Sequence, residues 1–211
     1  MTRVLMLGAN GRIARLVTGR LLDETDYDLR LFLRKPERLR VNDSRVDIVG
    51  GDTADAEALA AAVSGCDIVY SAVGPYNELQ SVRNVIAAME SAGVRRLIDV
   101  SALGIHDEVP GAFGRWNLSM VGSYMDAHKE AARLIEASGL DYTILRLAWL
   151  TDYDEVDYET TKKGEPFRGT EVSRKSAADL TVRLITEPGL YSRESIGVDK
   201  PGTDGDKPAF Y

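Results

Sequence analysis

The stretch VLMLGANGRIARLVTGRLL, residues 4–22, decides the fold. Its first four residues form an apolar run, which predicts a short buried strand from Val4 to Leu7. Behind Gly11, apolar residues recur at helical spacing, namely Ile13, Leu16, Val17 and Leu21. The stretch therefore predicts a strand, a glycine turn and a helix in direct succession.

The same alternation of elements continues along the chain. Further strands are predicted at 29–33, 46–49, 67–71, 95–100 and 142–147, with helical stripes between them. A loop is expected from about Ala102 to Gly114, and Ser173 is a candidate cap for a last helix through Ile185. Strands that alternate with amphipathic helices imply right-handed crossovers and helices on both faces of a parallel sheet. We therefore expect an α/β fold: a Rossmann-type doubly wound parallel sheet in three αβα layers.

Length and composition predict a single domain over residues 1–211, with 199–211 as a loop-like tail. The formal net charge of −7 opposes binding to nucleic acid, which needs a field of Lys and Arg. No apolar stretch is long enough for a membrane span or a signal peptide, so we expect no membrane partner. Both a homodimer and a monomer remain open.

Cysteine and histidine are scarce in this chain. Cys66 is the single cysteine, and His106 and His128 are the only histidines. This inventory cannot build a disulfide or a thiolate cluster, and it predicts no metal site. The lack of disulfides fits a reducing compartment, so a cytoplasmic location is expected.

The glycine turn has the composition of a dinucleotide-binding turn. Small residues between a strand and a helix let the backbone approach a pyrophosphate, which the helix N-terminus then holds. The spacing is Gly-x-x-Gly-x-x-Ala, and glycines that merely turn the chain are the alternative. The position of the turn favours binding, and we assign it to Gly8, Asn10, Gly11, Arg12 and Ile13.

Four blocks of sequence carry a family resemblance. They are GANGRIA at 8–14, LFLRKPERL at 31–39, GDTADAEALAAAVSGCDIVYSAVG at 51–74 and EASGLDYTILRLAWLTD at 136–152. Together they resemble the atypical short-chain dehydrogenase/reductase family, in its NAD(P)H-binding, NmrA-like branch. The resemblance covers nearly the whole chain, and it is more specific for the family than for any one activity.

The residues after the second strand bear on the choice of cofactor. NAD commonly meets an acidic residue there, whereas the 2′-phosphate of NADP needs a cation. This strand ends in Arg34 and Lys35, and Arg38 follows. A solvated basic face is the alternative, but the position favours NADP(H), with NAD(H) as the second choice.

The family resemblance implies further cofactor contacts. In the resembling family, the position of Asp52 and Thr53 approaches the adenine, although either residue could instead cap the next helix. The small residues Ala72, Val73 and Gly74 would run beside the cofactor ribose. Arg146 ends the sixth strand, where the family usually has an Arg-Pro-Gly turn near the nicotinamide; here Leu147 and Ala148 replace Pro and Gly.

The catalytic residues of the family are only partly present. Short-chain reductases use a Ser, a Tyr and a Lys four residues after the Tyr, whose ammonium lowers the pKa of the Tyr hydroxyl. This chain offers Ser101, which is also a candidate to hydrogen-bond the substrate or line the nicotinamide pocket of the cofactor, and Tyr124. However, His128 stands four residues beyond Tyr124 and Lys129 follows it. One residue rotates a helical side chain by about 100°, so Lys129 does not simply replace the missing Lys.

Three functions are compatible with these residues. The first is an NADP(H)-dependent oxidoreductase, an enzyme that transfers hydride to a small organic acceptor such as a flavin, quinone or carbonyl compound. The second is an NADP(H)-binding redox sensor with little catalysis, which His128 in place of Lys favours. The third is an epimerase or dehydratase, but the region after the sixth strand leaves little material for a nucleotide-sugar domain.

Overall fold

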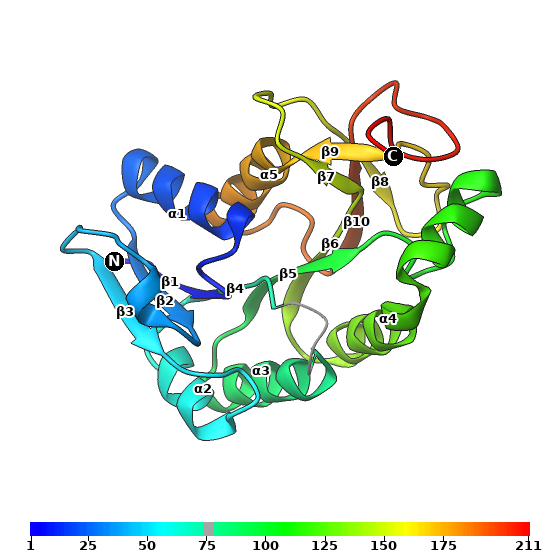
Figure 1. The fold of residues 1–211 in the computed structure, drawn as a ribbon. Coiled ribbons are helices and arrows are strands. Elements are labelled where there is room, and N and C mark those ends of the chain that lie inside the picture. Colours follow the sequence, from blue (N-terminus) through cyan, green and yellow to red (C-terminus); the bar gives the residue numbers. More distant parts are fainter. Residues whose placement is uncertain (74–77) are drawn as a thin grey trace.

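The computed structural model describes residues 1–73 and 78–211, and among these, eight strands form one sheet (Figure 1). In spatial order they are β3 (Val46–Gly50), β2 (Asp28–Leu33), β1 (Arg3–Leu7), β4 (Ile68–Ser71), β5 (Arg96–Ala102), β6 (Asp141–Leu147), β10 (Glu194–Asp199) and β8 (Glu159–Lys162). All neighbours pair in parallel except β10 and β8. Two shorter strands, β7 (Trp149–Thr151) and β9 (Glu171–Ser173), pair separately.

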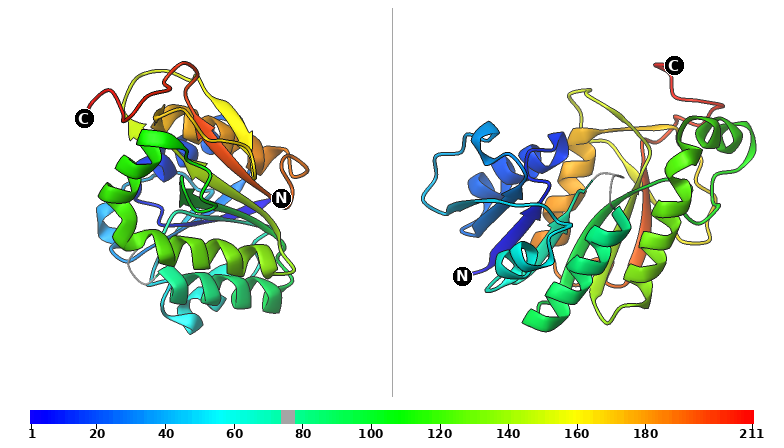
Figure 2. Two further views of the ribbon diagram at one scale, coloured as in Figure 1. Left: turned by 90° about the vertical axis from the view of Figure 1, so that its right-hand side faces the viewer. Right: turned by 60° about the horizontal axis from the view of Figure 1, so that its bottom comes forward.

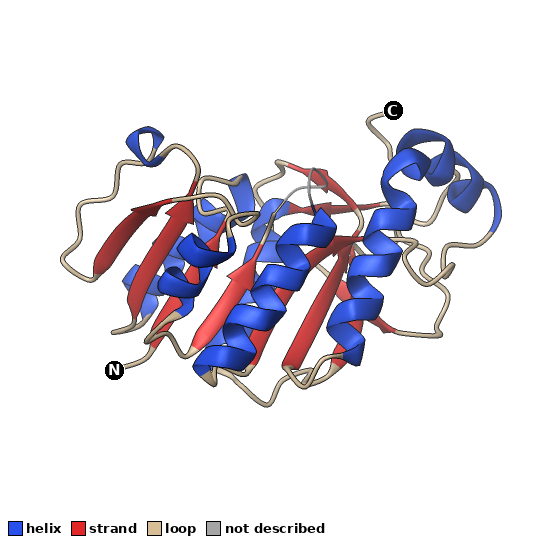
Figure 3. Ribbon diagram, turned by 90° about the horizontal axis from the view of Figure 1, so that it is seen from below, coloured by secondary structure: helices blue, strands red, loops and turns tan. Residues whose placement is uncertain are grey.

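Helices cover both faces of the sheet (Figures 1 and 2). One layer contains α1 (Arg12–Glu24) and α5 (Arg174–Thr186), which contact each other. The other contains α2 (Ala56–Val63), α3 (Glu78–Ala92) and α4 (Gly111–Ala137), which lie across the strands in Figure 3. The expected three-layer Rossmann-type fold is therefore confirmed. None of the helices in the described ranges is both long and apolar enough to cross a bilayer.

The inner strand β1 shows why the sheet needs a helix layer on each face. Its side chains alternate between the two hydrophobic cores: Val4 and Met6 join the core under α1 and α5, whereas Leu5 and Leu7 join the core under α2, α3 and α4. All four are fully buried. A parallel strand that is buried on both faces reads as a continuous apolar run, which is how this segment appears in the sequence.

The structure corrects three sequence-based expectations. The strands β10 and β8 were not predicted, and β8 makes the sheet mixed rather than wholly parallel. Asp199 was assigned to the loop-like tail, but it is the last residue of β10 and is 2% exposed. The loop expected through Gly114 ends earlier, because α4 begins at Gly111.

Ser173 caps α5 as predicted, since its hydroxyl accepts a hydrogen bond from the backbone N–H of Ser176.

A buried ion pair joins β6 to the loop before α4. The Nη1 of Arg146 lies 2.6 Å from Oε1 of Glu108, and the two side chains are 0% and 2% exposed. Backbone N–H groups of Gly104 and His106 also donate to the Glu108 carboxylate. Burial raises the pKa of Glu108, but the charge and hydrogen bond of Arg146 outweigh it and hold this pKa below its ordinary value.

We predict that Arg146→Met lowers the free energy of unfolding by about 3–5 kcal/mol, because it leaves the Glu108 carboxylate buried without its cation. Urea denaturation at neutral pH measures the change. Arg133→Met serves as the control, since Arg133 is 64% exposed and its pairing with Glu130 contributes little. A loss for Arg146→Met no larger than the loss for the control would contradict a structural role for the pair.

A second buried carboxyl group lies at the end of β10. Burial raises the pKa of Asp199 to about 7, with smaller contributions from the charges of Glu159 and Asp204. The backbone N–H of Gly169 and the charge of Arg146 offset this only in part. One carboxyl oxygen, Oδ1, has no hydrogen-bond partner among the described residues. The folded protein therefore binds a proton at Asp199 more tightly than the unfolded chain does.

This raised pKa predicts a stability that depends on pH. Asp199 ionises near pH 3.8 in the unfolded chain and near 7 in the folded protein, so its contribution to stability falls as pH rises between these values. The slope is at most about 1.4 kcal/mol per pH unit. Asp199→Asn removes this contribution, so the variant should gain stability relative to the wild type from pH 4 to pH 7. Denaturation at several pH values checks it, and a constant difference between the two proteins would contradict it.

Candidate functional site

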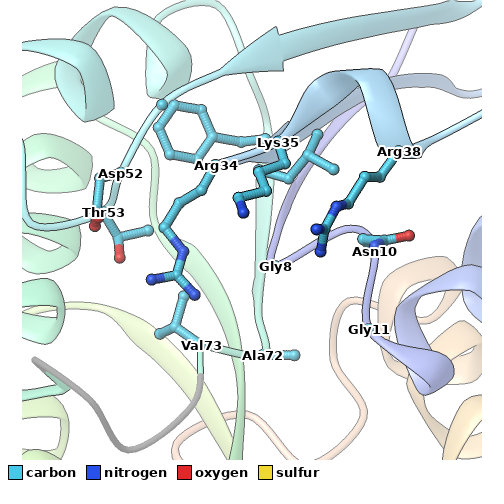
Figure 4. A pocket seen from close by; sticks show the side chains of 13 residues that line it. Gly8, Asn10, Gly11, Arg34, Lys35, Arg38, Asp52, Thr53, Ala72 and Val73 are labelled. Carbon is cyan, nitrogen blue, oxygen red and sulfur yellow. The ribbon is translucent and has the colours of Figure 1, made fainter.

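A cavity of about 540 Å³ opens at the carboxyl ends of β1 to β4. We call it the glycine-turn cavity. Figure 4 shows its lining side chains, which come from four strand-to-helix connections. They are Gly8, Asn10, Gly11, Phe32, Leu33, Arg34, Lys35, Arg38, Gly51, Asp52, Thr53, Ala72 and Val73. The carboxyl edge of a doubly wound sheet is where such folds bind ligands, and the cavity lies where the sequence order of the strands reverses around β1.

Glycine is required at the start of the turn after β1. Gly8 has a φ of +75°, a conformation that other residues rarely adopt, and a Cβ atom there would stand 2.6 Å from the carbonyl oxygen of Ala72. The backbone N–H of Gly8 donates to the carbonyl of Phe32 at 3.1 Å. These contacts hold the connections after β1, β2 and β4 close together, and the cavity lies between them.

The N-terminus of α1 is free to receive an anion. Its N-cap is Gly11, which has no side chain, so no side chain among the described residues caps the first N–H groups of the helix. Beside it, Oδ1 of Asn10 is buried without a hydrogen-bond partner in the described part of the chain. Unpaired helix N–H groups and the partial positive charge of the helix end suit a phosphate group.

Three cations extend from the segment after β2 into the glycine-turn cavity. Arg34 and Lys35 follow β2 directly, and Arg38 ends the short helix η1 (Pro36–Arg38). In Figure 4, the Arg34 side chain reaches into the space beside Val73, and Arg38 points toward Asn10. Throughout residues 1–73 and 78–211, none of the three forms an ion pair. Their charge is therefore available to an anionic ligand.

The opposite wall of the cavity is held by a polar network. The hydroxyls of Thr53 and Ser81 lie 2.8 Å apart, and Nδ2 of Asn84 donates to the carbonyls of Thr53 and Ala54 at 3.0 Å each. Neither Asp52 nor Thr53 caps the following helix. That position belongs to Asp55, whose carboxylate accepts from the N–H groups of residues 57 and 58. Asp52 and Thr53 are thereby presented to the cavity.

The cavity brings together nine of the residues assigned to cofactor binding from the sequence. They are Gly8, Asn10, Gly11, Arg34, Lys35, Asp52, Thr53, Ala72 and Val73. Gly74, which was also assigned, lies outside the described residues. Phe32, Leu33 and Gly51 line the cavity but were not assigned. Gly51 lets the chain pass close to Phe32, since a Cβ atom there would lie 2.4 Å from the Phe32 ring, but only the structure shows this contact.

Four other assigned cofactor residues do not line this cavity: Arg12, Ile13, Arg146 and Ser101, the last of which is also a catalytic candidate. Ile13 is 8% exposed and packs in the core under α1. Arg12 turns toward Asp152, with which it forms an ion pair. The Arg146 side chain is 0% exposed and donates to the carbonyls of Thr161 and Ser195 in addition to Glu108. The cofactor contact expected of the Arg146 side chain is therefore not available to it.

The catalytic candidates occupy β5 and α4. Ser101 is half-buried near the carboxyl end of β5, and Tyr124 on α4 is 39% exposed. His128 and Lys129 follow one helical turn later and are half-buried. The Nζ of Lys129 lies 2.5 Å from Oδ1 of Asp107, so its ammonium is engaged by a carboxylate in the preceding loop.

Known proteins resemble the chain over nearly its whole length. A family model described as NAD(P)H-binding matches residues 8–188. A short-chain dehydrogenase/reductase from Veillonella parvula DSM 2008, solved in complex with NADP, has 31% identity, covers 99% of each chain and superposes with a TM-score of 0.93. One curated relative is an uncharacterized sugar epimerase, YhfK, from Bacillus subtilis (strain 168), with 28% identity over 90% of this chain and 91% of that protein. Another is an NAD(P)H azoreductase from Xenophilus azovorans, with 26% identity over 88% of this chain and 64% of that protein.

We predict that Gly11→Val abolishes binding of both NADPH and NADH, raising each dissociation constant by about 100-fold or more. A Cβ atom at Gly11 already lies 3.2 Å from the carbonyl oxygen of Gly8, and the valine methyls would fill the turn. Fluorescence titration of the reduced dinucleotides measures it. Gly19→Val on α1 is the control, because nothing lies within 4 Å of its added Cβ. Unchanged affinity in Gly11→Val would remove the turn from the site.

Proposed function

Because the chain belongs to the NAD(P)H-binding family, we propose that it is an NADP(H)-dependent oxidoreductase that transfers hydride to a small organic acceptor. In the proposed reaction, NADPH, a proton and the oxidised acceptor give NADP⁺ and the reduced acceptor. The azoreductase among its relatives supports a reductase, and the Veillonella structure supports NADP as the dinucleotide.

One observation carries the preference for NADP. The segment after β2 presents Arg34, Lys35 and Arg38 to the glycine-turn cavity, and among the described residues none of them is paired with a carboxylate. No acidic residue stands at 33–35, where one would accept the ribose hydroxyls of NAD. A guanidinium can hold a phosphate with two parallel hydrogen bonds, so Arg34 is the residue proposed for the 2′-phosphate.

The other residues of the cavity fit the rest of the dinucleotide. Gly8, Gly11 and the open end of α1 would hold the pyrophosphate, while Asp52 and Thr53 would border the adenine. When bound, the nicotinamide supplies the hydride, which is chemistry that belongs to the cofactor. The protein then has to orient the acceptor, and Ser101 and Tyr124 are proposed to donate hydrogen bonds to it.

A sensor with little catalysis is the second candidate, and the contact between Lys129 and Asp107 favours it. An ammonium that lies 2.5 Å from a carboxylate is already engaged, so Lys129 is a poor substitute for the Lys that the family uses. An acceptor that is itself redox-active, such as a flavin or quinone, needs less help from the protein than a carbonyl compound does. The proposed enzyme therefore prefers a flavin or a quinone to a simple ketone as its acceptor.

An epimerase acting on a nucleotide sugar is less well supported, although one relative is called a sugar epimerase. Among the described segments after β6, β8 and β10 complete the sheet, and α5 completes the helix layer that contains α1. They leave no separate lobe in the described chain for a sugar nucleotide.

Steady-state oxidation of NADPH by the purified protein tests the activity. Flavins, quinones and carbonyl compounds serve as acceptors, and NADH is measured in parallel. Turnover with a flavin or quinone would support the proposed reductase. Absence of turnover with every acceptor, in a sample that binds NADPH with micromolar affinity, would favour the sensor instead.

We predict that Arg34→Ala weakens NADPH binding by about 10- to 100-fold and changes NADH binding by less than about threefold, because only NADPH carries the 2′-phosphate. Titration of both dinucleotides against the variant and the wild type measures the two ratios. Arg40→Ala is the matched control, since Arg40 is exposed in the same segment but does not line the cavity. Equal weakening of both dinucleotides would remove the reason for preferring NADP.

A further inference from the structure

A second cavity, of about 480 Å³, adjoins the glycine turn at the N-terminal ends of α1 and α5. We call it the basic cavity. It is lined by Arg12, Arg15, Leu16, Asp152, Tyr153, Arg174 and Lys175. Gly11 lines the first cavity and Arg12 lines this one, so the two sites meet at consecutive residues of one turn. The proposed oxidoreductase function uses none of the residues of the basic cavity.

The charge of the basic cavity is opposite to that of the whole protein. Four of its seven lining residues are cations and one is an acid, whereas the chain carries a formal net charge of −7. A second acid, Asp154, forms an ion pair with Lys175 from outside the lining. The local excess of two positive charges persists after both acids are counted, and it favours an anionic ligand.

The cations differ in how firmly the protein holds them. Arg174 is 19% exposed and donates to the carbonyls of Leu150 and Thr151 and, at 2.9 Å, to Asp152. Arg12 also pairs with Asp152, whose carboxylate is 56% exposed. Arg15 forms no ion pair within the described segments. Exposed ion pairs of this kind are weak, so a dianion from solution can compete with Asp152 for the guanidinium groups.

The remaining lining residues are apolar or aromatic. Leu16 directly follows Arg15 on α1, one turn beyond Arg12, and Tyr153 is 50% exposed beside Asp152. The cavity volume falls within the range of sites for small organic molecules and exceeds what an inorganic ion needs. Cations beside an aromatic ring and an aliphatic side chain suit a ligand with an anionic head and an apolar body.

We propose that the basic cavity binds a small organic phosphate or carboxylate, with its anionic group on Arg12, Arg15 and Lys175 and its apolar body against Tyr153 and Leu16. The basic cavity shares no lining residue with the glycine-turn cavity, and the proposal does not depend on the oxidoreductase activity. Because Arg12 directly follows the turn that holds the pyrophosphate, a ligand bound here lies next to the cofactor.

Isothermal titration calorimetry with phenyl phosphate tests the site, in protein saturated with NADPH so that the glycine-turn cavity is filled. Phenyl phosphate should bind, phenol should not, and inorganic phosphate should bind more weakly because it lacks an apolar body. Benzoate distinguishes a site for carboxylates from one that requires phosphate. Binding should weaken as the salt concentration rises, since most of the cations are exposed.

Two sets of variants locate the binding. Arg15→Gln combined with Lys175→Gln should weaken phenyl phosphate binding by about tenfold, because two charged contacts are lost. Arg133→Gln is the matched control on α4 and should leave the affinity unchanged. Asp152→Asn should strengthen binding by about threefold, because it removes the carboxylate that competes for Arg12 and Arg174.

Several results would overturn the proposal. These are the absence of binding to the NADPH-saturated wild type, binding that occurs only by displacing NADPH, and equal affinity in the double variant and the control. Equal affinities for phenyl phosphate and inorganic phosphate would overturn the assignment of Tyr153 and Leu16 to an apolar body. None of these outcomes depends on turnover, so failure of the proposed reductase activity would be seen separately.

Discussion

The close approach of the Gly8 backbone to the carbonyl of Ala72 is the constraint on which the rest of the structure depends. A Cβ atom at Gly8 would stand 2.6 Å from that oxygen, so only glycine lets the chain turn here with a positive φ. This turn sets where α1 begins, which is directly after the end of β1. Because β1 is paired on both sides, by β2 and by β4, the connections after all three strands meet at one point. The glycine-turn cavity is a consequence of that meeting.

The sequence was most informative where local pattern and tertiary position agree. The apolar run before Gly8 and the helical stripe after Gly11 predicted β1 and α1, because a strand buried on both faces and an amphipathic helix have distinct periods. The pattern failed for β8 and β10. The segment Glu194–Asp199 is short and half of it is polar, and its burial comes from pairing with β6 and β8 rather than from its own composition. Local sequence cannot show pairing of that kind.

The same distinction applies to the site. Arg34 could be placed from the sequence because the end of β2 has a fixed relation to the glycine turn in this fold. Arg12 could not, because its direction depends on Asp152, which is 140 positions away in the chain. Arg146 likewise looked like a cleft residue from its position at the end of a strand, but Glu108 holds it in the core. Long side chains follow their partners, and those partners are set by tertiary structure.

The two cavities place cations on both sides of one turn in an acidic protein. On one side of the turn lies the glycine-turn cavity, where the cations after β2 are unpaired by any described residue. The Arg12 side chain lies on the other side, in the basic cavity, where surface carboxylates already form ion pairs with some of the cations. The first arrangement favours a ligand that is held tightly, since nothing has to be displaced. The second favours an exchangeable ligand, because every anion that binds there must compete with Asp152.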